Sequence, residues 1–479
     1  MKWIGTERKI FGGNLMEEVK NFLKEKAGFI LRELLGGGGD FADIFYEKTK
    51  SMRIHYEDRR VDKINYGIQE GVGLRLIKGG KTYYGYTSDI NFKNLIELAK
   101  VIARNGSNGY SFALGKRHIK GFTDVKIDPD AVDLNYKIEI LKRADDKARS
   151  YGDNVKQVSS VLMDKNREIL IINNLGEISE DVQKRVIFYV EVISSDGNIL
   201  QRGYEAIGGT KGFEIFEEIP PEFVASKAAE RALLGLKAKP APAGKFTVIM
   251  SSEAGGTMIH EAVGHGLEAD LVQQGLSVYA GKLGKKVASE MVTVVDDATI
   301  PGYNGSFTVD DEGVPAKRKV LIDKGILVGY MYDRLRAMKE GIESTGNGRR
   351  QSYAHIPIVR MTNTFIAPGK YKGEDIIRDT KRGVYVVKMG GGEVNTVTGD
   401  FVFEIMEGYL IENGEITYPI RGATLIGNGP KALNNIDAVG NEVGWSIGTC
   451  GKNGQGVPVS DGQPVIRMND LILGGSEAS

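Results

Sequence analysis

A segment rich in proline and alanine, Lys239-Pro240-Ala241-Pro242-Ala243-Gly244, divides this 479-residue chain near its middle. Proline-rich segments favour extended backbone and commonly connect domains. A single hydrophobic core rarely grows beyond about 250–300 residues, so a chain of this length needs more than one domain. The sequence therefore predicts a domain boundary at residues 238–239.

Before this linker, helical and strand-like patterns alternate. Apolar residues recur at helical spacing over residues 17–35, 91–104, 134–150 and 221–236. Short alternating runs between residues 41 and 87, and again between 155 and 194, predict antiparallel strands, with Asp196-Gly197 as a hairpin turn. A second set of helical and strand-like patterns begins near residue 119, which predicts a second domain boundary there. The expected domains are an N-terminal domain at 1–118, a central domain at 119–238 and a C-terminal domain at 239–479.

After the linker, residues 245–250 predict a buried strand and residues 253–271 a largely apolar helix. From about residue 290 onward the pattern is again strand and turn, with Asn413-Gly414 as a strong hairpin signal. A short helix is expected at 331–341. The whole predicts an α+β fold, with β-rich N-terminal and C-terminal domains and few helices.

Composition excludes several classes of protein. The 63 acidic and 63 basic residues cancel, which argues against a partner that is a nucleic acid or an anionic membrane. The one cysteine, Cys450, cannot form an internal disulfide, which fits a reducing compartment. No apolar run approaches the ~20 residues that span a bilayer, and residues 1–26 lack a signal-peptide core. We expect a soluble, cytoplasmic protein.

The chemistry of the chain is indicated by His260-Glu261-Ala262-Val263-Gly264-His265, which holds two of its five histidines. Two neutral imidazoles bind Zn²⁺, and a carboxylate beside them can take a proton from the attacking water. The alternative is that both histidines are ordinary polar residues of a buried helix, each with its own hydrogen-bond partner. We interpret the motif as part of a zinc-binding helix at the start of the C-terminal domain.

The spacing of the two histidines constrains that helix. Five residues correspond to a rotation of about 140° on a regular α-helix, which would point the two rings apart. A π-bulge absorbs the extra residue, and Gly264 permits the distortion. The sequence therefore predicts an i→i+5 irregularity between His260 and His265.

A catalytic zinc site normally takes three protein ligands. Cys450, within the glycine-rich stretch 447–456, is one candidate for the third, and Glu268 and Asp270 are equally compatible with the spacing. His355 is a further candidate, as a hydrogen-bond donor in the transition state, although a structural role fits it better.

Residues 260–270 resemble the signature of the TldD/PmbA family of zinc peptidases, in its TldD branch. Asp310-Asp311-Glu312-Gly313, residues 360–364 and residues 447–456 resemble further family blocks, in the same order. The resemblance covers most of 240–479 and, more loosely, the N-terminal part. The PmbA branch lacks the histidine–glutamate motif, so its presence here favours the TldD branch.

The resemblance implies specific roles. His260, His265 and Cys450 would be zinc ligands, and Glu261 would be the catalytic base. Members of the family commonly form a dimer with a PmbA-type subunit and act on short or unfolded peptides in the cytoplasm; this chain could instead pair with itself. The expected function is a zinc-dependent peptidase. The alternatives are a zinc hydrolase of small amides and a non-catalytic, PmbA-like partner subunit.

Overall fold

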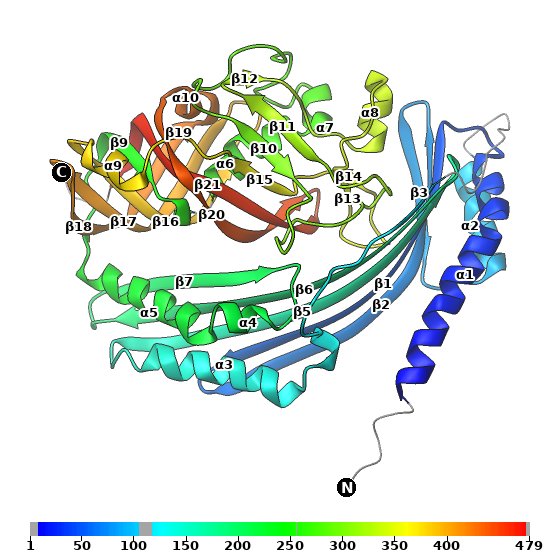
Figure 1. Cartoon of the computed structure of the whole chain (residues 1–479), viewed down its shortest axis with the longest axis horizontal. Helices are drawn as coiled ribbons and strands as arrows, with labels where there is room; N and C mark the ends of the chain where they lie inside the picture. Colours follow the sequence, from blue (N-terminus) through cyan, green and yellow to red (C-terminus); the bar gives the residue numbers. More distant parts are fainter. Residues whose placement is uncertain (1–7, 105–116, 255, 476–479) are drawn as a thin grey trace, which may run out of the picture.

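The chain forms two β-sheets that lie alongside each other, with most of its long helices on the outer side of the first (Figure 1). The computed structural model describes residues 8–104, 117–254 and 256–475. Strands take up 46% of the chain and helices 24%. This confirms the predicted α+β class, with β-rich domains and few helices.

Within the described residues the first sheet has seven strands in the order β3-β2-β1-β5-β6, and β4 and β7 both pair with β6. Strand β1 pairs antiparallel with β2 on one side and with β5 on the other. Strands from the ranges 41–87 and 155–209 therefore share one continuous hydrogen-bonded sheet. The strands are β1 (Phe41–Glu57), β2 (Arg60–Lys78), β3 (Lys81–Thr87), β4 (Arg117–Lys120), β5 (Val155–Asn173), β6 (Glu177–Ser195) and β7 (Leu200–Gly209).

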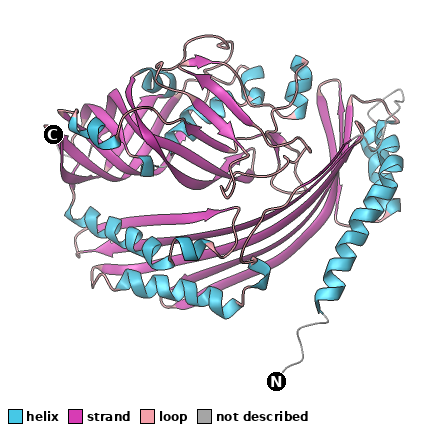
Figure 2. Cartoon of the chain, viewed as in Figure 1, coloured by secondary structure: helices cyan, strands magenta, loops and turns pink. Residues whose placement is uncertain are grey.

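The helices predicted before the linker are confirmed and cover the outer face of this sheet (Figure 2). Apolar side chains of α1 and α2 pack on β1 and β2, and those of α3 and α5 pack on β5 and β6. In the part of the chain that the structure describes, none of the helices is both long and apolar enough to cross a membrane. The helices are α1 (Arg8–Leu35), α2 (Phe92–Ala103), α3 (Leu134–Arg149), α4 (Ile215–Glu218) and α5 (Pro221–Lys237), with a 3₁₀ turn at Pro129–Ala131.

The second sheet has twelve strands among the described residues, in the order β12-β11-β10-β15-β21-β9-β16-β17-β18-β8, with β19 and β20 attached to β21. Its largest apolar cluster is built around β9, β16, β17 and β21. The strands are β8 (Lys239–Pro240), β9 (Gly244–Met250), β10 (Val294–Asp297), β11 (Arg318–Asp323), β12 (Ile326–Leu327), β15 (Asn363–Ile366), β16 (Arg382–Val394), β17 (Asp400–Glu412), β18 (Glu415–Arg421), β19 (Ala423–Asn428), β20 (Ile436–Lys452) and β21 (Gln455–Gly474). Along the chain, these strands are interrupted by a separate two-stranded pair, β13 (Gly348–Arg349) and β14 (Ile358–Val359), and by helices α8 (Arg334–Glu340), α9 (Gly373–Arg378) and α10 (Gly429–Asn434).

The linker and hairpin predictions can be compared with the backbone directly. Residues 239–240 pair in parallel with β18, and Ala241 is fully buried, so the connecting segment is anchored to the second sheet. Asn413 and Gly414 both have positive φ, 53° and 82°, which confirms the predicted tight turn between β17 and β18. Gly197, with φ of 97°, lies in the short connection between β6 and β7.

Buried ion pairs join the first sheet to the C-terminal half of the chain. Arg75 on β2 bonds Asp43 on β1 and also Glu312, and all three side chains are almost completely buried. Arg167 on β5 bonds Asp311, with 2.7 Å between Nη1 and Oδ1. Both pairs use residues of the 310–313 block, which holds that loop against the first sheet.

Candidate metal centre

The histidine motif lies on a series of short helical turns. The prediction of one helix over 253–271 is wrong, because two residues interrupt it: Gly256 is left-handed, with φ of 68°, and Glu268 is extended, with φ of −79° and ψ of 121°. The turns are a 3₁₀ turn (Ser252–Ala254), α6 (Thr257–Ile259), a π turn (His260–Gly264), a second 3₁₀ turn (His265–Leu267) and α7 (Ala269–Gln273).

The predicted i→i+5 irregularity is confirmed. The π turn spans His260–Gly264, and the backbone N–H of His265 donates to the carbonyl of His260. The wider turn brings the two imidazoles onto one side, with ring centroids 5.0 Å apart. Gly264 is required by packing as well, since a Cβ there would lie 1.9 Å from Sδ of Met361.

Each imidazole is oriented by a buried carboxylate on its Nδ1 atom. His260 Nδ1 lies 2.8 Å from Oδ1 of Asp461, and His265 Nδ1 lies 2.9 Å from Oε2 of Glu268. A carboxylate partner fixes Nδ1 as the protonated nitrogen and leaves Nε2 as the free ligand atom.

The third group comes from the β20–β21 hairpin, 185 residues from His265. A two-residue turn at Asn453 and Gly454, with φ of 51° and 72°, closes this hairpin and sets Cys450 opposite Val457. The guanidinium of Arg360 donates to the carbonyls of Cys450 and Gln455, one on each strand of the hairpin.

His260, His265 and Cys450 form a cluster that fits a metal ion. Their ligand atoms all lie within 4.8 Å of one another, and Cys450 Sγ is 3.5 Å from His265 Nε2. Ligands at about 2.0–2.3 Å from a tetrahedral ion are themselves separated by roughly 3.3–3.8 Å, so only a small adjustment is needed. Of the two alternatives to Cys450, Glu268 is bonded to His265 and Asp270 is bonded to Lys452, 2.7 Å away.

The electrostatics of the cluster favour the thiolate of Cys450 but the protonated form of His265, so a metal ion would have to displace a proton from that imidazole. Burial raises the pKa of the Cys450 thiol, but hydrogen bonds from both histidines outweigh it and lower that pKa to about 5. Burial lowers the pKa of His265, and the nearby Glu268 carboxylate more than reverses this, giving a pKa of about 9. A thiolate beside two histidines is a typical ligand set for zinc.

Glu261 occupies a different position from the three candidate ligands. Its side chain is part-buried, and burial raises the pKa of its carboxyl group above the ordinary value. Within the described residues no hydrogen bond engages this carboxylate, and it is outside the His260–His265–Cys450 cluster. It is therefore free to accept a proton from a water molecule or substrate beside the cluster.

Three further residues, His355, Asp461 and Lys452, bear on the predictions made for this site. His355 lies in its own turn, with Nδ1 2.9 Å from Ser352 Oγ, as a structural histidine would. The sequence prediction missed Asp461 and Lys452, which orient His260 and Glu268. Lys452 lies within the 447–456 block and Asp461 five residues after it, but no local spacing connects them to residues 260–268.

A buried cluster of two imidazoles and a thiol, with a part-buried and unengaged carboxylate adjacent to it in sequence, is the kind of centre found in metal-dependent hydrolases. The chain belongs to the PmbA/TldA metallopeptidase family: residues 42–105 match its domain 1, residues 127–236 its central domain and residues 243–475 its C-terminal domain.

Curated relatives cover nearly the whole chain. A TldD-homologue metalloprotease of Haemophilus influenzae is 36% identical, with 91% of this chain and 93% of that protein aligned. A metalloprotease of Methanocaldococcus jannaschii is 39% identical over 90% of this chain and 96% of its own length. A protein of Saccharolobus solfataricus named as a zinc metalloprotease TldD homologue is 29% identical, over 91% and 97% of the two chains.

Solved structures share the fold. A Thermotoga maritima structure superposes with a TM-score of 0.78 at 23% identity, covering 96% of this chain and all of the other. TldE of Thermococcus kodakarensis gives a TM-score of 0.73 at 20% identity, covering 95% and 100%.

Proposed function

We propose that this chain is a zinc-dependent peptidase that cleaves peptide bonds in short or unfolded peptides. The observation that carries the proposal is the cluster of His260, His265 and Cys450, with both Nδ1 atoms already engaged by carboxylates. These three residues would hold the zinc ion. When bound, zinc supplies a Lewis acid that polarises the substrate carbonyl and lowers the pKa of water.

Glu261 would act as the general base. It would accept a proton from the attacking water and pass it to the leaving amine. Its raised pKa suits this role, because a base must also be able to release the proton it has taken. A Cys450 thiolate would make the zinc a milder Lewis acid than three neutral histidines would.

A peptide substrate is favoured over a small amide by the edge of the second sheet. Among the described strands β20, which carries Cys450, pairs with β21 alone. An unpaired strand edge can bind an extended peptide through its main-chain groups. A small amide would make no use of such an edge.

The test separates catalysis from metal binding. Glu261→Gln keeps the size of the side chain and removes the base, so zinc content and folding should be retained while peptide cleavage falls by at least ~10²–10⁴-fold. His260→Ala should lose zinc and activity together. Products from a mixed peptide library would be identified by mass spectrometry, with and without a chelator.

Two outcomes would contradict the proposal. Parent-like cleavage by Glu261→Gln would exclude this residue as the base. Absence of any cleavage, even with a PmbA-type subunit added, would favour the alternative of a non-catalytic partner subunit.

A further inference from the structure

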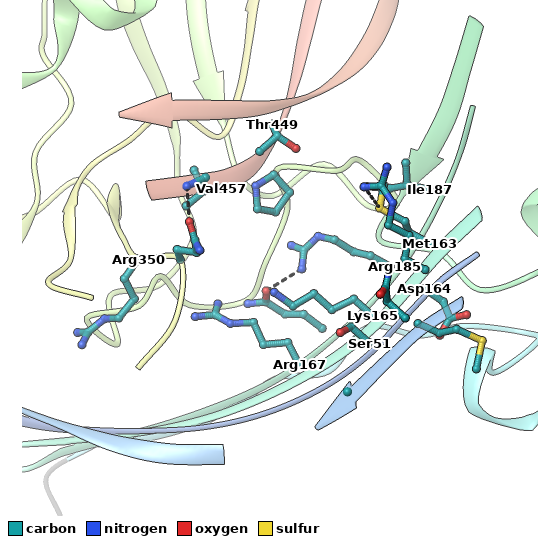
Figure 3. Close-up of a pocket in the computed structure, with 18 of the residues that line it drawn as sticks. Ser51, Met163, Asp164, Lys165, Arg167, Arg185, Ile187, Arg350, Thr449 and Val457 are labelled. Atoms are coloured by element: carbon teal, nitrogen blue, oxygen red, sulfur yellow. Dashed lines mark hydrogen bonds between the residues drawn. The ribbon is translucent and has the colours of Figure 1, made fainter. Parts of the chain in front are cut away.

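A cavity of about 490 Å³ lies between the first sheet and the C-terminal half of the chain (Figure 3). Its floor is formed by β1, β2, β5 and β6, and Thr449 and Val457 of the β20–β21 hairpin lie on the opposite side. The lining is strongly cationic. Six basic side chains reach it, but only two carboxylates, Asp164 and Asp311; the basic residues are Arg53, Lys165, Arg167, Arg185, Arg349 and Arg350.

Both carboxylates are already engaged. Asp164 bonds Lys137, outside the cavity, at 2.7 Å, and Asp311 bonds Arg167 at the same distance. Arg350 also lies 4.0 Å from Asp43, and Arg167 lies 3.0 Å from Glu47. The lining cations without a carboxylate partner among the described residues are therefore Arg53, Lys165, Arg185 and Arg349.

Three cations show this most clearly. Arg185 donates to the carbonyls of Asn304 and Ser306 and to the side chain of Gln183, all of them neutral. Arg349 donates to two backbone carbonyls. The ammonium group of Lys165 has no hydrogen bond or ion pair within the described residues.

Lys165 and Arg185 are also direct cross-strand neighbours in the β5–β6 ladder. Like charges in this position repel each other and destabilise a sheet. Burial and the neighbouring arginine lower the pKa of Lys165 to about 8, and burial with nearby arginines lowers that of Arg185 to about 9. In addition, Arg167 is 94% buried, and its Nη2 atom has no hydrogen-bond partner among the described residues. Clustered cations with unpaired buried N–H groups lower the stability of the fold unless a bound anion pairs with them.

The hairpin relates this cavity to the metal centre. Thr449 and its cross-strand partner Pro458 both line the cavity. Successive side chains of a strand point to opposite faces, so Thr449 points to the cavity side of the hairpin and Cys450 to the side of the cluster. A peptide extended along the free edge of β20 would likewise present alternate side chains to the two faces. One residue would face the metal centre, and its neighbour would reach the cavity.

We propose that this cavity is a carboxylate-binding subsite, in which Lys165, Arg185 and Arg349 hold a carboxylate of the peptide substrate. The inference rests on the proposed peptidase function and adds a substrate class to it: peptides that carry an acidic side chain or a free C-terminal carboxylate near the cleaved bond. Charge-assisted hydrogen bonds from two or more cations to one carboxylate are the interactions that the lining offers.

The experiment compares matched peptides that differ only in charge. One pair exchanges Asp for Asn next to the cleaved bond, and a second exchanges a free C-terminus for an amide, which separates the two sources of a carboxylate. The zinc-loaded parent should cleave one of the acidic members with a kcat/KM about 10–100-fold higher than its neutral partner, as expected for one or two charge-assisted hydrogen bonds. Lys165→Met should abolish most of this preference, because kcat/KM should fall much further for the acidic peptide than for its neutral partner.

Two further variants serve as controls. Lys165→Arg keeps the charge and should keep the preference. Lys156→Met removes an exposed lysine of the same strand and should have no effect. Because Lys165→Met removes a part-buried cation that repels its cross-strand neighbour Arg185, it should unfold at the same temperature as the parent or higher, so a lost preference would not reflect misfolding.

Binding to the Glu261→Gln variant, measured by fluorescence anisotropy of labelled peptides, separates this inference from the proposed function. Tighter, Lys165-dependent binding of an acidic peptide without cleavage by the parent would support the subsite and contradict the peptidase proposal. Cleavage of acidic and neutral peptides at equal rates would overturn the subsite and leave the peptidase proposal intact. Lys165-dependent binding of inorganic phosphate, with no preference among the peptides, would also overturn it.

Discussion

The residues of the candidate centre fall into two groups that differ in how far a sequence can reveal them. His260, Glu261 and His265 lie within six consecutive residues, and their types and spacing predict a metal motif directly. Asp461 is 201 residues from the imidazole that it orients, and nothing in its neighbourhood marks it as a partner. Cys450 could be proposed as a ligand because it is the one thiol, and the family resemblance favoured it over Glu268. Its place beside the histidines depends on the fold of the β20–β21 hairpin, which the residue pattern does not specify.

The carboxylate on His260 should be important for metal affinity. Asp461→Asn keeps the side-chain volume but removes the charge that fixes the Nδ1 proton. We expect zinc affinity to fall by roughly 10–100-fold, as is typical when the partner of a ligating histidine is changed. Competition with a chromophoric chelator measures the affinity.

Asp437→Asn is a suitable control, since Asp437 is an exposed partner of Arg467 on the same sheet and should leave zinc binding unchanged. Equal zinc affinities for the parent and Asp461→Asn would mean that Asp461 has no part in orienting His260.

At the level of elements, periodicity located the helices before the linker and the strands, but it failed for residues 253–271. An apolar run predicts burial well, and here the run is buried. It cannot reveal that Gly256 takes a left-handed conformation or that Glu268 becomes extended, because both follow from contacts with distant segments. The π turn was predictable because it follows from the ligand spacing itself.

Packing of the π turn against Met361 can be tested by a double-mutant cycle. Gly264→Ala places a Cβ where Sδ of Met361 lies, and the overpacking should lower the free energy of unfolding by ~1–3 kcal/mol. Met361→Ala alone should also destabilise, by ~2–5 kcal/mol, because it leaves a cavity.

The double variant should lose less unfolding free energy than the two single variants lose together, since the shortened side chain makes room for the new methyl group. Urea denaturation of all four proteins gives the coupling. Strict additivity would show that the turn shifts freely and that Gly264 is not confined by Met361.

On the scale of the whole molecule, the pairing of β1 with β5 could not be read from the sequence. Alternation predicts that each is a strand but does not specify its partner, because many pairs of half-buried strands satisfy the same pattern. The buried ion pairs between the two halves were equally hidden, although the 310–313 block had been singled out. These ion pairs mean that the orientation of the first sheet relative to the C-terminal half depends on charge as well as on packing.

Breaking one of these pairs should have a large effect. Arg75→Met leaves Asp43 and Glu312 buried without their cation and should cost ~3–5 kcal/mol of unfolding free energy. Arg202→Met removes an exposed partner of Glu191 and should cost no more than about 1 kcal/mol. Chemical denaturation compares the two, and similar losses would show that the Arg75 network contributes no more than a surface pair.

The assembly is a further prediction at this scale. Residues 60–70 of β2 extend beyond β3, so part of this strand has a free edge, and Ile64, Tyr66 and Ile68 are exposed along it. An exposed apolar edge favours association with another chain. We therefore expect a dimer, with a second copy or with a PmbA-type subunit, in light-scattering measurements. A fully active monomer would contradict this expectation.

The distance along the chain between His265 and Cys450 has a consequence for synthesis. A ribosome that adds ~5–20 residues per second needs on the order of 10–40 s to pass from the second candidate ligand to the third. Throughout that interval the nascent protein holds two imidazoles but lacks the thiolate that would complete their coordination. A product terminated early in the second sheet would therefore carry the recognisable motif yet remain unable to assemble the centre.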